Sequence, residues 1–333
     1  MRRNALRVTL GVLALIGLCH LANADDRVAI MVAGIEKQIY LPVKLAEQLG
    51  YFVEQGLDVE LLSEPSGVHA EDVLLAGAVQ GVVGFYDHTV QLQARGKAVV
   101  SVVQLGGTPG EVELVALRMA AQIKSPGDLK GRTLGVTDLR SSTHILTQYL
   151  AASHGVKLNE ISVLPVGSGD RFIAAMNDGT VDAGMSTEPT VSRMLKSGEA
   201  RILVDLRSAD STVDALGGPY PAACLYMNTA WVNRHKKVVQ RLADALVKAL
   251  QYIQTHSAEE IASHVPAEYY AGDKELYVQT LASTKATFTP DGRMPAAGPA
   301  TVLKVLSAVD TNVQEKRINL SQTYTSEFVA ARR

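Results

Sequence analysis

Gly135-Val-Thr-Asp-Leu-Arg-Ser-Ser-Thr-His144, followed directly by Ile145-Leu-Thr-Gln-Tyr-Leu150, is the stretch around which the chain is organised. It has the pattern of a buried strand that ends in a short polar loop and continues into the first turn of a helix. Such a turn leaves backbone N–H groups unpaired and carries a partial positive charge. Its hydroxyl and imidazole side chains therefore predict a site for an anion or another polar ligand.

The composition is that of a globular protein with a sizeable core. The chain has 333 residues, which predicts two domains or one large one. Hydrophobic residues make up 47% and charged residues 20%. The net charge is only -2, and acids match the scattered bases, so no nucleic-acid partner is expected. After the N-terminal region no stretch approaches the roughly 18–20 apolar residues of a membrane span.

The first 24 residues have the pattern of a secretory signal peptide. A basic segment, Met1 to Arg7, precedes an apolar segment from Val8 to Leu21, and Ala22-Asn-Ala24 gives a small-x-small cleavage pattern. We therefore expect cleavage after Ala24 and a periplasmic mature protein. An uncleaved anchor helix and a lipoprotein attached at Cys19 are the alternatives, although Leu18 is bulkier than the residue usual before a lipidated cysteine.

Cys224 is the one cysteine that follows this cleavage site, so no intramolecular disulfide is expected. It lies in the apolar run Ala222-Ala-Cys-Leu-Tyr-Met227, which predicts a small core residue. His69, His88 and His144 lack the spacing of metal ligands. Neither a metal site nor a cofactor is therefore expected.

Two successive α/β units follow each other at an offset of about 100 residues. Strands are predicted at 27–33, 57–62, 79–85 and 98–104, and again at 132–137, 160–166, 181–184 and 200–205; helices are predicted at 41–52, 69–76 and 87–94, and again at 142–153, 170–177 and 188–196. Short segments also agree in sequence, because Ala76-Gly-Ala-Val-Gln-Gly-Val-Val-Gly84 matches Asp178-Gly-Thr-Val-Asp-Ala-Gly184. The pattern predicts two similar lobes, each a sheet with helices on both faces. Chance similarity between two generic α/β halves is the alternative.

Two strand-like runs fall outside the repeat and connect the lobes. Residues 113–118 lead from the first unit to the second, and residues 222–228 lead back. We therefore expect lobe 1 to comprise residues 25–112 and 222–333, and lobe 2 residues 113–221, with a hinge of two crossings. Helices expected at 230–255, 258–263, 273–287, 300–309 and near Tyr324 would return to cover lobe 1.

The strongest site candidates follow the opening strand. In open α/β sheets ligands bind at the carboxyl ends of the strands. Ser141, Ser142, Thr143 and His144 would donate hydrogen bonds to an oxyanion there, and the Arg140 guanidinium suits a carboxylate, sulfonate or nitrate. Plain capping of the helix by one serine is the alternative.

The matching position of the first unit holds Tyr86, Asp87 and His88. We expect the tyrosine ring to stack on a ligand, the imidazole to bond it, and Asp87 to cap the helix that follows. In lobe 2, Glu188 precedes Pro189, and either caps the next helix or accepts a hydrogen bond from a ligand amine or ring N–H.

The loop after the first strand supplies two further candidates. Gln38 and Tyr40 are placed in the site, whereas Glu36 and Lys37 are expected to form a solvated pair. No nucleophile elbow, P-loop, H-E-x-x-H motif or paired cysteine stands out, so no enzyme is predicted.

Four motifs in order carry a resemblance to a known family. They are Gly50-Tyr-Phe-Val-Glu-Gln-Gly-Leu-Asp-Val-Glu-Leu61, Asp128-Leu-Lys-Gly-Arg-Thr-Leu-Gly-Val136, Ser141-Ser-Thr-His-Ile-Leu146 and Val181-Asp-Ala-Gly-Met-Ser-Thr-Glu-Pro189. Over roughly residues 27 to 255 the chain resembles the nitrate/sulfonate/taurine-type solute-binding proteins of bacterial ABC importers. Their fold is shared with fungal thiamine-pyrimidine synthases.

The resemblance implies the two-lobed fold of the type II periplasmic binding proteins, with two hinge crossings. It also implies that Ser141, Ser142, Thr143 and Glu188 face the ligand. The expected protein is a monomer that captures a small organic anion by closing its lobes, and an inner-membrane ABC permease is its partner. One departure is Arg140, because the family often has glycine just before the serines.

Three other functions stay open at this point. A binding protein for a thiamine-pyrimidine or another heterocycle would use Tyr86 for stacking and Glu188 for a ring nitrogen. A pyrimidine-synthase-like enzyme is expected to be cytosolic and to carry a metal-binding cysteine cluster, which the signal peptide and the lone Cys224 argue against. A sensor subunit for a membrane kinase would have the same sequence features as a transporter subunit.

Overall fold

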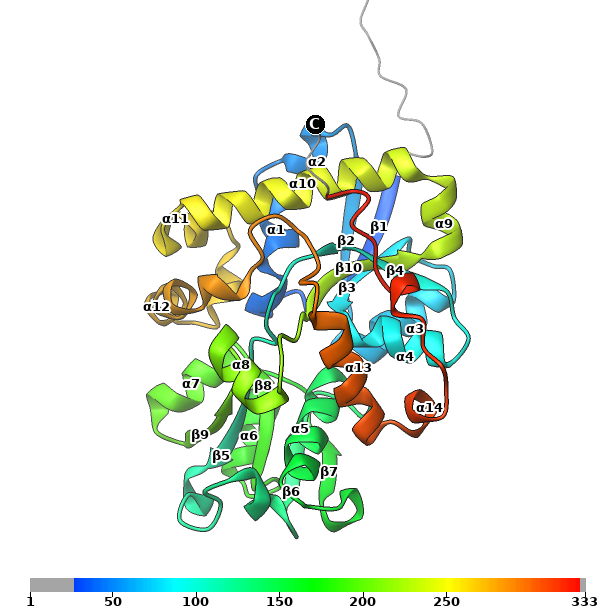
Figure 1. Ribbon diagram of the computed structural model, residues 1–333. Coiled ribbons are helices and arrows are strands. Elements are labelled where there is room, and N and C mark those ends of the chain that lie inside the picture. The colour runs from blue at the N-terminus through cyan, green and yellow to red at the C-terminus, as the bar shows by residue number, and fades with distance from the viewer. Residues whose placement is uncertain (1–26, 330–333) are drawn as a thin grey trace, which may run out of the picture.

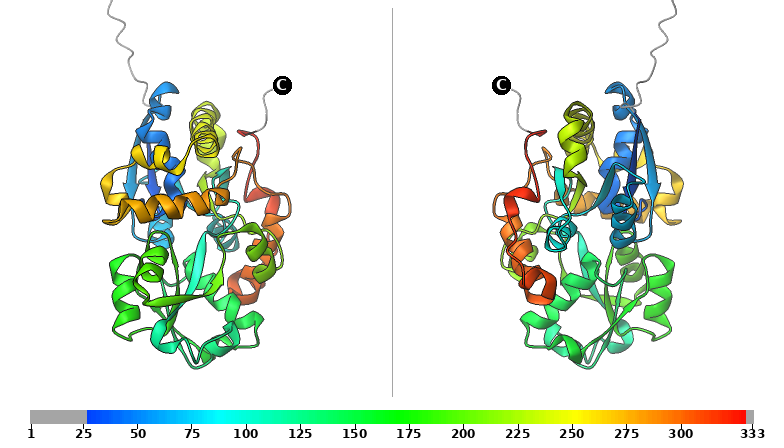
Figure 2. Two further views of the ribbon diagram at one scale, coloured as in Figure 1. Left: turned by 90° about the vertical axis from the view of Figure 1, so that its left-hand side faces the viewer. Right: turned by 90° about the vertical axis from the view of Figure 1, so that its right-hand side faces the viewer.

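A computed structural model describes residues 27–329 (Figures 1 and 2). Two lobes lie one above the other in Figure 1, each built around a five-stranded sheet with helices around it. The upper sheet contains β1 (Arg27–Val32), β2 (Asp58–Ser63), β3 (Gly81–Phe85), β4 (Val99–Gln104) and β10 (Ala223–Asn228), and the lower sheet β5 (Glu111–Ala116), β6 (Thr133–Val136), β7 (Ser162–Pro165), β8 (Ala183–Thr187) and β9 (Ala200–Asp205). The predicted two-lobed α/β fold is confirmed.

The helices follow the strands in the alternating order that the repeat predicted. They are α1 (Leu41–Gln48), α2 (Tyr51–Glu54), α3 (Gly67–Leu75), α4 (Asp87–Ala94), α5 (Ser142–Ser153), α6 (Asp170–Asn177), α7 (Thr190–Ser197), α8 (Ala209–Leu216), α9 (Thr229–Arg234), α10 (Lys236–Thr255), α11 (Ala258–Ser263), α12 (Lys274–Thr284), α13 (Gly298–Val309) and α14 (Thr311–Gln314). No helix within residues 27–329 combines the length and the apolar character needed to cross a bilayer.

Both sheets have the same topology. The order is β2-β1-β3-β10-β4 in the upper sheet and β7-β6-β8-β5-β9 in the lower one. In the upper sheet β1, β2 and β3 are parallel, and β10 pairs antiparallel with β3. In the lower sheet β6, β7 and β8 are parallel, and β5 pairs antiparallel with β8. Both antiparallel strands, β5 and β10, follow a crossing between the lobes. The shared order supports the internal repeat. It also shows that neither sheet is purely parallel.

Some predicted helix boundaries are wrong for local reasons. The helix expected at 41–52 is divided at Gly50, whose φ of 72° is a left-handed conformation that favours glycine. The helix expected at 230–255 is divided at His235, where α9 ends. The tail helix expected near Tyr324 is a 3₁₀ turn at Leu320–Gln322, and Tyr324 itself forms a β-bridge with Ser101.

Helix α13 packs against both lobes, so the C-terminal helices do more than cover lobe 1. It lies against α5 of the lower lobe and α4 of the upper lobe, as Figure 1 shows. Val305 and Leu306 on α13 belong to the same buried cluster as Ile145 and Leu146 on α5. Apolar packing therefore joins the lobes at this edge, beside the polar contacts described below.

Truncating this packing is expected to destabilise the whole chain. Leu306 is 0% exposed, and replacing a buried leucine by alanine costs about 2–5 kcal/mol. We expect Leu306→Ala to lower the midpoint of urea unfolding clearly. Ala308→Ser, at an exposed position of the same helix, should lower it far less, because only a small difference in helix propensity is involved. Equal midpoints for both variants would contradict the packing.

Candidate ligand-binding site

A small polar cavity lies between the lobes, with a volume of about 20 Å³. It is enclosed by the loop after β1, the end of β3, the first residue of β5, the end of β6 and the first turn of α5. Its lining residues are Lys37, Ile39, Tyr40, Gly67, Phe85, His88, Glu111, Thr137, Ser141, Ser142, Thr143 and Thr187. A volume of this size holds about one water molecule. The lobes are therefore closed on each other here.

A wider hollow of about 170 Å³ opens beside the cavity and is also bordered by both lobes. Lys37 borders both spaces. The other residues at the wider hollow are Glu36, Ser168, Gly169, Asp170, Glu188, Pro189, Thr190, Arg193, Glu268, Tyr269 and Ala271. The loops at the carboxyl ends of the strands thus meet between the lobes, where the sequence placed them.

The serine-rich turn holds itself together through its hydroxyls. Ser141 caps α5 by accepting from the backbone N–H of His144, and its own Oγ lies 2.6 Å from the carbonyl oxygen of Asp138, to which it donates. Thr143 Oγ1 accepts from the backbone N–H of Thr137 at 2.9 Å. Capping and ligand contact were alternatives for this turn, and the hydroxyl of Ser141 serves the cap.

Ser142 instead reaches across to the other lobe. Its Oγ donates to Asp87 Oδ1 at 3.0 Å, while the hydroxyl of Tyr220 donates to Asp87 Oδ2 at 3.1 Å. Asp87 is fully buried, and burial raises the pKa of its carboxyl, although the neighbouring His88 and these hydrogen bonds act in the opposite direction. Asp87 is the first residue of α4 rather than its cap. Its carboxylate bridges the lobes.

His88 borders the cavity but is anchored away from it. Its Nδ1 lies 3.2 Å from Glu71 Oε2, and the same carboxylate also pairs with Arg95. Burial by itself lowers the pKa of His88, but the hydrogen bond and charge of Glu71 and the charge of Asp87 outweigh it, so that this pKa is raised. An imidazole ring fixed by Glu71 therefore borders the cavity.

Tyr40, not Tyr86, presents its ring to the cavity. The Tyr86 hydroxyl lies 2.5 Å from Thr323 Oγ1 near the end of the chain, and its ring meets Tyr324 edge-on. This side chain lies in the core of lobe 1. Tyr40 lines the cavity and packs edge-on against Phe85 with ring centroids 6.5 Å apart.

Arg140 adopts a left-handed backbone conformation, with φ of 67°. Its backbone N–H donates to His144 Nδ1 at 2.7 Å, and burial lowers the pKa of His144. The Arg140 side chain is exposed and borders a separate small pocket with Glu71 and Asp310. The cleft cavity does not contain it. Glycine adopts this left-handed conformation at less cost than arginine does.

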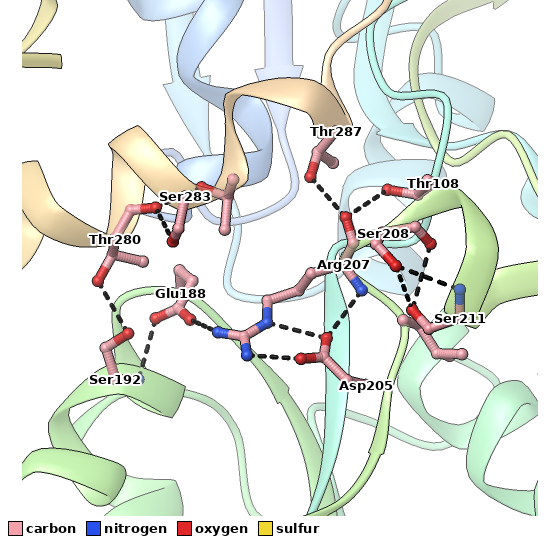
Figure 3. A network of polar contacts seen from close by, with 12 residues as sticks. Thr108, Glu188, Ser192, Asp205, Arg207, Ser208, Ser211, Thr280, Ser283 and Thr287 are labelled. Atoms are coloured by element: carbon pink, nitrogen blue, oxygen red, sulfur yellow. Dashed lines mark hydrogen bonds and ion pairs between the residues drawn. The ribbon is translucent and has the colours of Figure 1, made fainter.

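Glu188 belongs to a polar network that joins the lobes beside the cavity (Figure 3). Its Oε1 accepts from Arg207 Nη1 at 2.8 Å, and its Oε2 accepts from the backbone N–H of Ser192 at 3.0 Å in the first turn of α7. The network continues into lobe 1, where Thr280 donates to Ser192 Oγ at 2.8 Å and Thr287 donates to the Arg207 carbonyl oxygen at 3.1 Å. Pro189 is the N-cap residue of α7, and Glu188, one residue earlier, takes the capping role only by accepting this one backbone N–H of the first turn.

Gln38 lies next to this network and is almost fully buried. Its backbone N–H donates to the carbonyl oxygen of Glu188 at 3.1 Å, and its Oε1 accepts from Thr284 at 3.0 Å. Within residues 27–329 its Nε2 has no partner. The side chain faces a gap of about 10 Å³ that it shares with Glu188 and Arg207. Gln38 thus contacts lobe 2 through its backbone.

The expectation of a solvated pair at Glu36 and Lys37 is wrong for the lysine. Lys37 is 6% exposed, and its Nζ donates to the carbonyl oxygens of Ala33 at 2.8 Å and Pro65 at 3.2 Å. The loop after β1 folds back on itself and carries the side chain inward. Burial lowers the pKa of Lys37, while the charges of Glu36 and Glu111 oppose that shift.

Glu111 is another cavity residue that sequence reasoning missed. It begins β5, two residues before the crossing was expected, and is 2% exposed. Its Oε2 has no hydrogen-bond partner among the described residues. Burial, followed by the charge of Asp87, raises the pKa of Glu111 well above its usual range. The alternation of Glu111 and Glu113 in an apolar run was the available signal, because such residues share one face of a strand.

Comparison with known proteins assigns the chain to a family. Residues 39–260 match the family described as NMT1/THI5 like, and the chain belongs to this family. A solved structure of a protein from Bordetella bronchiseptica RB50 is 34% identical, with a TM-score of 0.86 and coverage of 91% of this chain and 96% of that one. The fold is thus that of the two-lobed binding proteins.

Two further relatives indicate the range of functions on this fold. The periplasmic aliphatic sulphonate binding protein SsuA of Escherichia coli is 19% identical, with a TM-score of 0.68 and coverage of 89% of this chain and 96% of that one. The 4-amino-5-hydroxymethyl-2-methylpyrimidine phosphate synthase THI13 of Saccharomyces cerevisiae is 24% identical over 238 residues, which cover 69% of this chain and 68% of the yeast protein. Binding proteins and enzymes both occur among the relatives.

Replacing Arg140 is expected to separate backbone strain from side-chain contacts. A non-glycine residue in the left-handed region costs about 1 kcal/mol, so Arg140→Gly should unfold at a higher urea concentration than Arg140→Ala. Both variants lack the guanidinium, and therefore any difference between them reports the backbone. If the alanine variant is as stable as the glycine variant, the left-handed conformation is not the cause.

Proposed function

We propose that this protein is the solute-binding component of an ABC importer and captures a small organic anion between its lobes. The observation that carries the proposal is the polar cavity at the lobe interface, closed by the hydrogen bond from Ser142 to Asp87. Membership of the family and the likeness in fold to binding proteins support it. The ligand classes proposed are sulfonates, carboxylates and nitrate-like anions.

Capture requires the lobes to separate and close again. A cavity of about 20 Å³ admits roughly one water, so a solute enters after the lobes have rotated apart. A ligand that bridges both lobes then favours the closed form, because it binds that form better. An inner-membrane permease would recognise the closed form. The protein acts as a monomer in this scheme, with residues 25–112 and 222–333 as one lobe and residues 113–221 as the other.

The first turn of α5 is the proposed anion contact. Ser142 and Thr143 line the cavity at the N-terminus of this helix, where the helix dipole favours negative charge. The basic side chains of Lys37 and His88 also line the cavity. Of the other candidates, Tyr40 and Asp87 act from lobe 1. Catalysis is not part of the proposal.

The proposed location is the periplasm. It rests on the signal peptide expected at residues 1–24, which lies outside the described residues, and on the periplasmic location of the E. coli sulphonate-binding protein.

A heterocycle such as a thiamine pyrimidine is the second candidate ligand. The buried carboxylate of Glu111 and the ring of Tyr40 line the same cavity, and both suit a flat ligand with N–H groups. The pyrimidine synthases among the relatives make this class worth including in any screen.

A thermal-shift screen of residues 25–333 would test the function. We expect sulfonates, carboxylates or nitrate to raise the melting temperature, since a ligand bound only to the folded state stabilises it. A response to pyrimidines alone would favour the second candidate. If no member of any class shifts the transition at millimolar concentration, the proposal fails.

Ser142→Ala is expected to weaken the binding of whichever anion the screen identifies. The variant loses the hydrogen bond from Ser142 to a buried carboxylate, and such bonds contribute about 1.5–3 kcal/mol, or roughly ten- to hundred-fold in affinity. Isothermal calorimetry measures the change. Ser153→Ala, at the far end of α5, is the matched control and should bind as the wild type does. Unchanged affinity for Ser142→Ala would rule out closure through this bond.

A further inference from the structure

Glu111 is a carboxyl group from which the closed cleft excludes water. It is 2% exposed, it lines the cavity between the lobes, and its Oε2 has no hydrogen-bond partner among residues 27–329. Lobe 1 supplies part of this enclosure through Lys37, Tyr40 and His88. Separation of the lobes therefore returns water to Glu111, and closing removes it. Loss of water disfavours the charged form of a carboxyl group.

A second carboxyl group approaches Glu111 from the other lobe. Asp87 begins α4 of lobe 1, whereas Glu111 begins β5 in the lower sheet. Burial, followed by the charge of Asp87, raises the pKa of Glu111 well above its usual range. Two carboxylates that meet in a site without water repel each other, and one of them then binds a proton. Closing therefore favours protonation of one of the two.

The hydrogen bonds show which carboxyl group keeps its charge. Asp87 Oδ1 accepts from Ser142 and Oδ2 accepts from Tyr220, so that both oxygens are stabilised in the charged form. Glu111 Oε2 accepts no hydrogen bond in the described part of the chain. Glu111 is therefore the carboxyl group that binds the proton.

Lys37 is the cation that opposes this protonation. Its charge lowers the pKa of Glu111, but burial and Asp87 outweigh it. Its Nζ donates to the carbonyl oxygens of Ala33 at 2.8 Å and Pro65 at 3.2 Å, whereas Glu111 Oε2 has no partner among the described residues. The third N–H of this ammonium group is the contact that would hold Glu111 in its charged form. A test has to distinguish that ion pair from a neutral Glu111.

The other titratable groups around the cavity either remain neutral or are paired within one lobe. Burial raises the pKa of Tyr40 and Tyr220 well above the usual value, so both stay neutral. His88 pairs with Glu71, and both belong to lobe 1. Glu113, next to the site on β5, accepts its hydrogen bond within lobe 2. Serine and threonine side chains line the cavity from α5, from the end of β6 and from β8.

We propose that the lobes close around a neutral Glu111, so that closing takes up one proton from the solvent. The inference rests on the proposed function only in requiring that the lobes open and close, and it applies to any anion that is captured. A lower pH then favours the closed form, because that form binds one proton more than the open form. The effect is confined to the pH range between the carboxyl pKa of the open form and the higher pKa of the closed form.

Spin labels on opposite lobes provide the test. Val53→Cys on lobe 1 and Leu117→Cys on lobe 2 place the labels at exposed positions, and the native Cys224 is buried. Pulsed electron spin resonance on ligand-free residues 25–333 would measure the distance between the labels from about pH 5 to pH 9. We expect the ratio of closed to open molecules to rise as the pH falls, by up to about ten-fold per pH unit for one proton.

Two glutamine variants of the labelled protein locate the proton. Glu111→Gln should remove the pH dependence, because the amide is neutral throughout this range. Glu113→Gln is the matched control and should retain the dependence, since Glu113 lies on the same strand but accepts its hydrogen bond from Thr147 of the same lobe.

The outcomes separate this inference from the proposed function. A ratio that does not change with pH overturns the inference, and it is the result expected if Lys37 pairs with a charged Glu111. A dependence that persists in Glu111→Gln, or is lost in folded Glu113→Gln, also overturns it, because another group then binds the proton. Closing that depends on pH, together with no response in the anion screen, supports the inference and overturns the proposed function. The measurement with both glutamates in place does not depend on the folding of either glutamine variant.

Discussion

The exchange of one strand between the two sheets is the constraint on which the rest of the structure depends. β5 leaves lobe 1 and pairs antiparallel inside the sheet of lobe 2, and β10 returns to do the same in lobe 1. Buried backbone N–H and C=O groups without a partner are costly, so the hydrogen bonds of β5 and β10 fix both crossings to their sheets. The two connections also bond to each other, through Gly106 and Ala222 at 3.1 Å. Motion between the lobes is therefore confined to rotation about two adjacent segments.

The contacts across the closed cleft differ in kind, and the difference suits reversible closure. Ser142 with Asp87, Thr280 with Ser192, and the backbone of Gln38 with Glu188 are hydrogen bonds. Bonds between neutral groups exchange for water at a net cost of about 0.5–1.5 kcal/mol each, and a bond to a carboxylate such as Asp87 at about 1.5–3 kcal/mol. The packing of α13 on α5 is apolar and is lost only at a larger cost. These contacts favour an opening in which the hydrogen bonds across the cleft break while α13 stays packed on α5.

Local signals sufficed for the fold and for half of the site. α5 and α6 begin and end where the sequence placed them, and the serine at position 141 caps α5 as expected. The failures involve partners distant in sequence. Tyr86 turns inward because Thr323, 237 residues away, accepts or donates a hydrogen bond there. Lys37 is buried by a loop that folds back to Pro65. Periodicity in a single sequence does not reveal contacts between residues so far apart. The buried position of Glu111, in contrast, could have been predicted from its two-residue spacing to Glu113 in an apolar run.

Under the proposed function, the placement of the cavity residues gives binding an order. Glu111 begins β5, a strand of the lower sheet, and α5 packs on β6 and β8 of that same sheet. Rotation of the lobes would therefore leave Glu111 and the first turn of α5 at a fixed separation. Lobe 1 contributes Asp87 and Tyr40, which approach only on closing. In the proposed open form the Ser142 hydroxyl would be released from Asp87 and available to an incoming acid group. Closing would then restore the bond between the lobes, so that lobe 2 would contact the ligand first and lobe 1 would retain it.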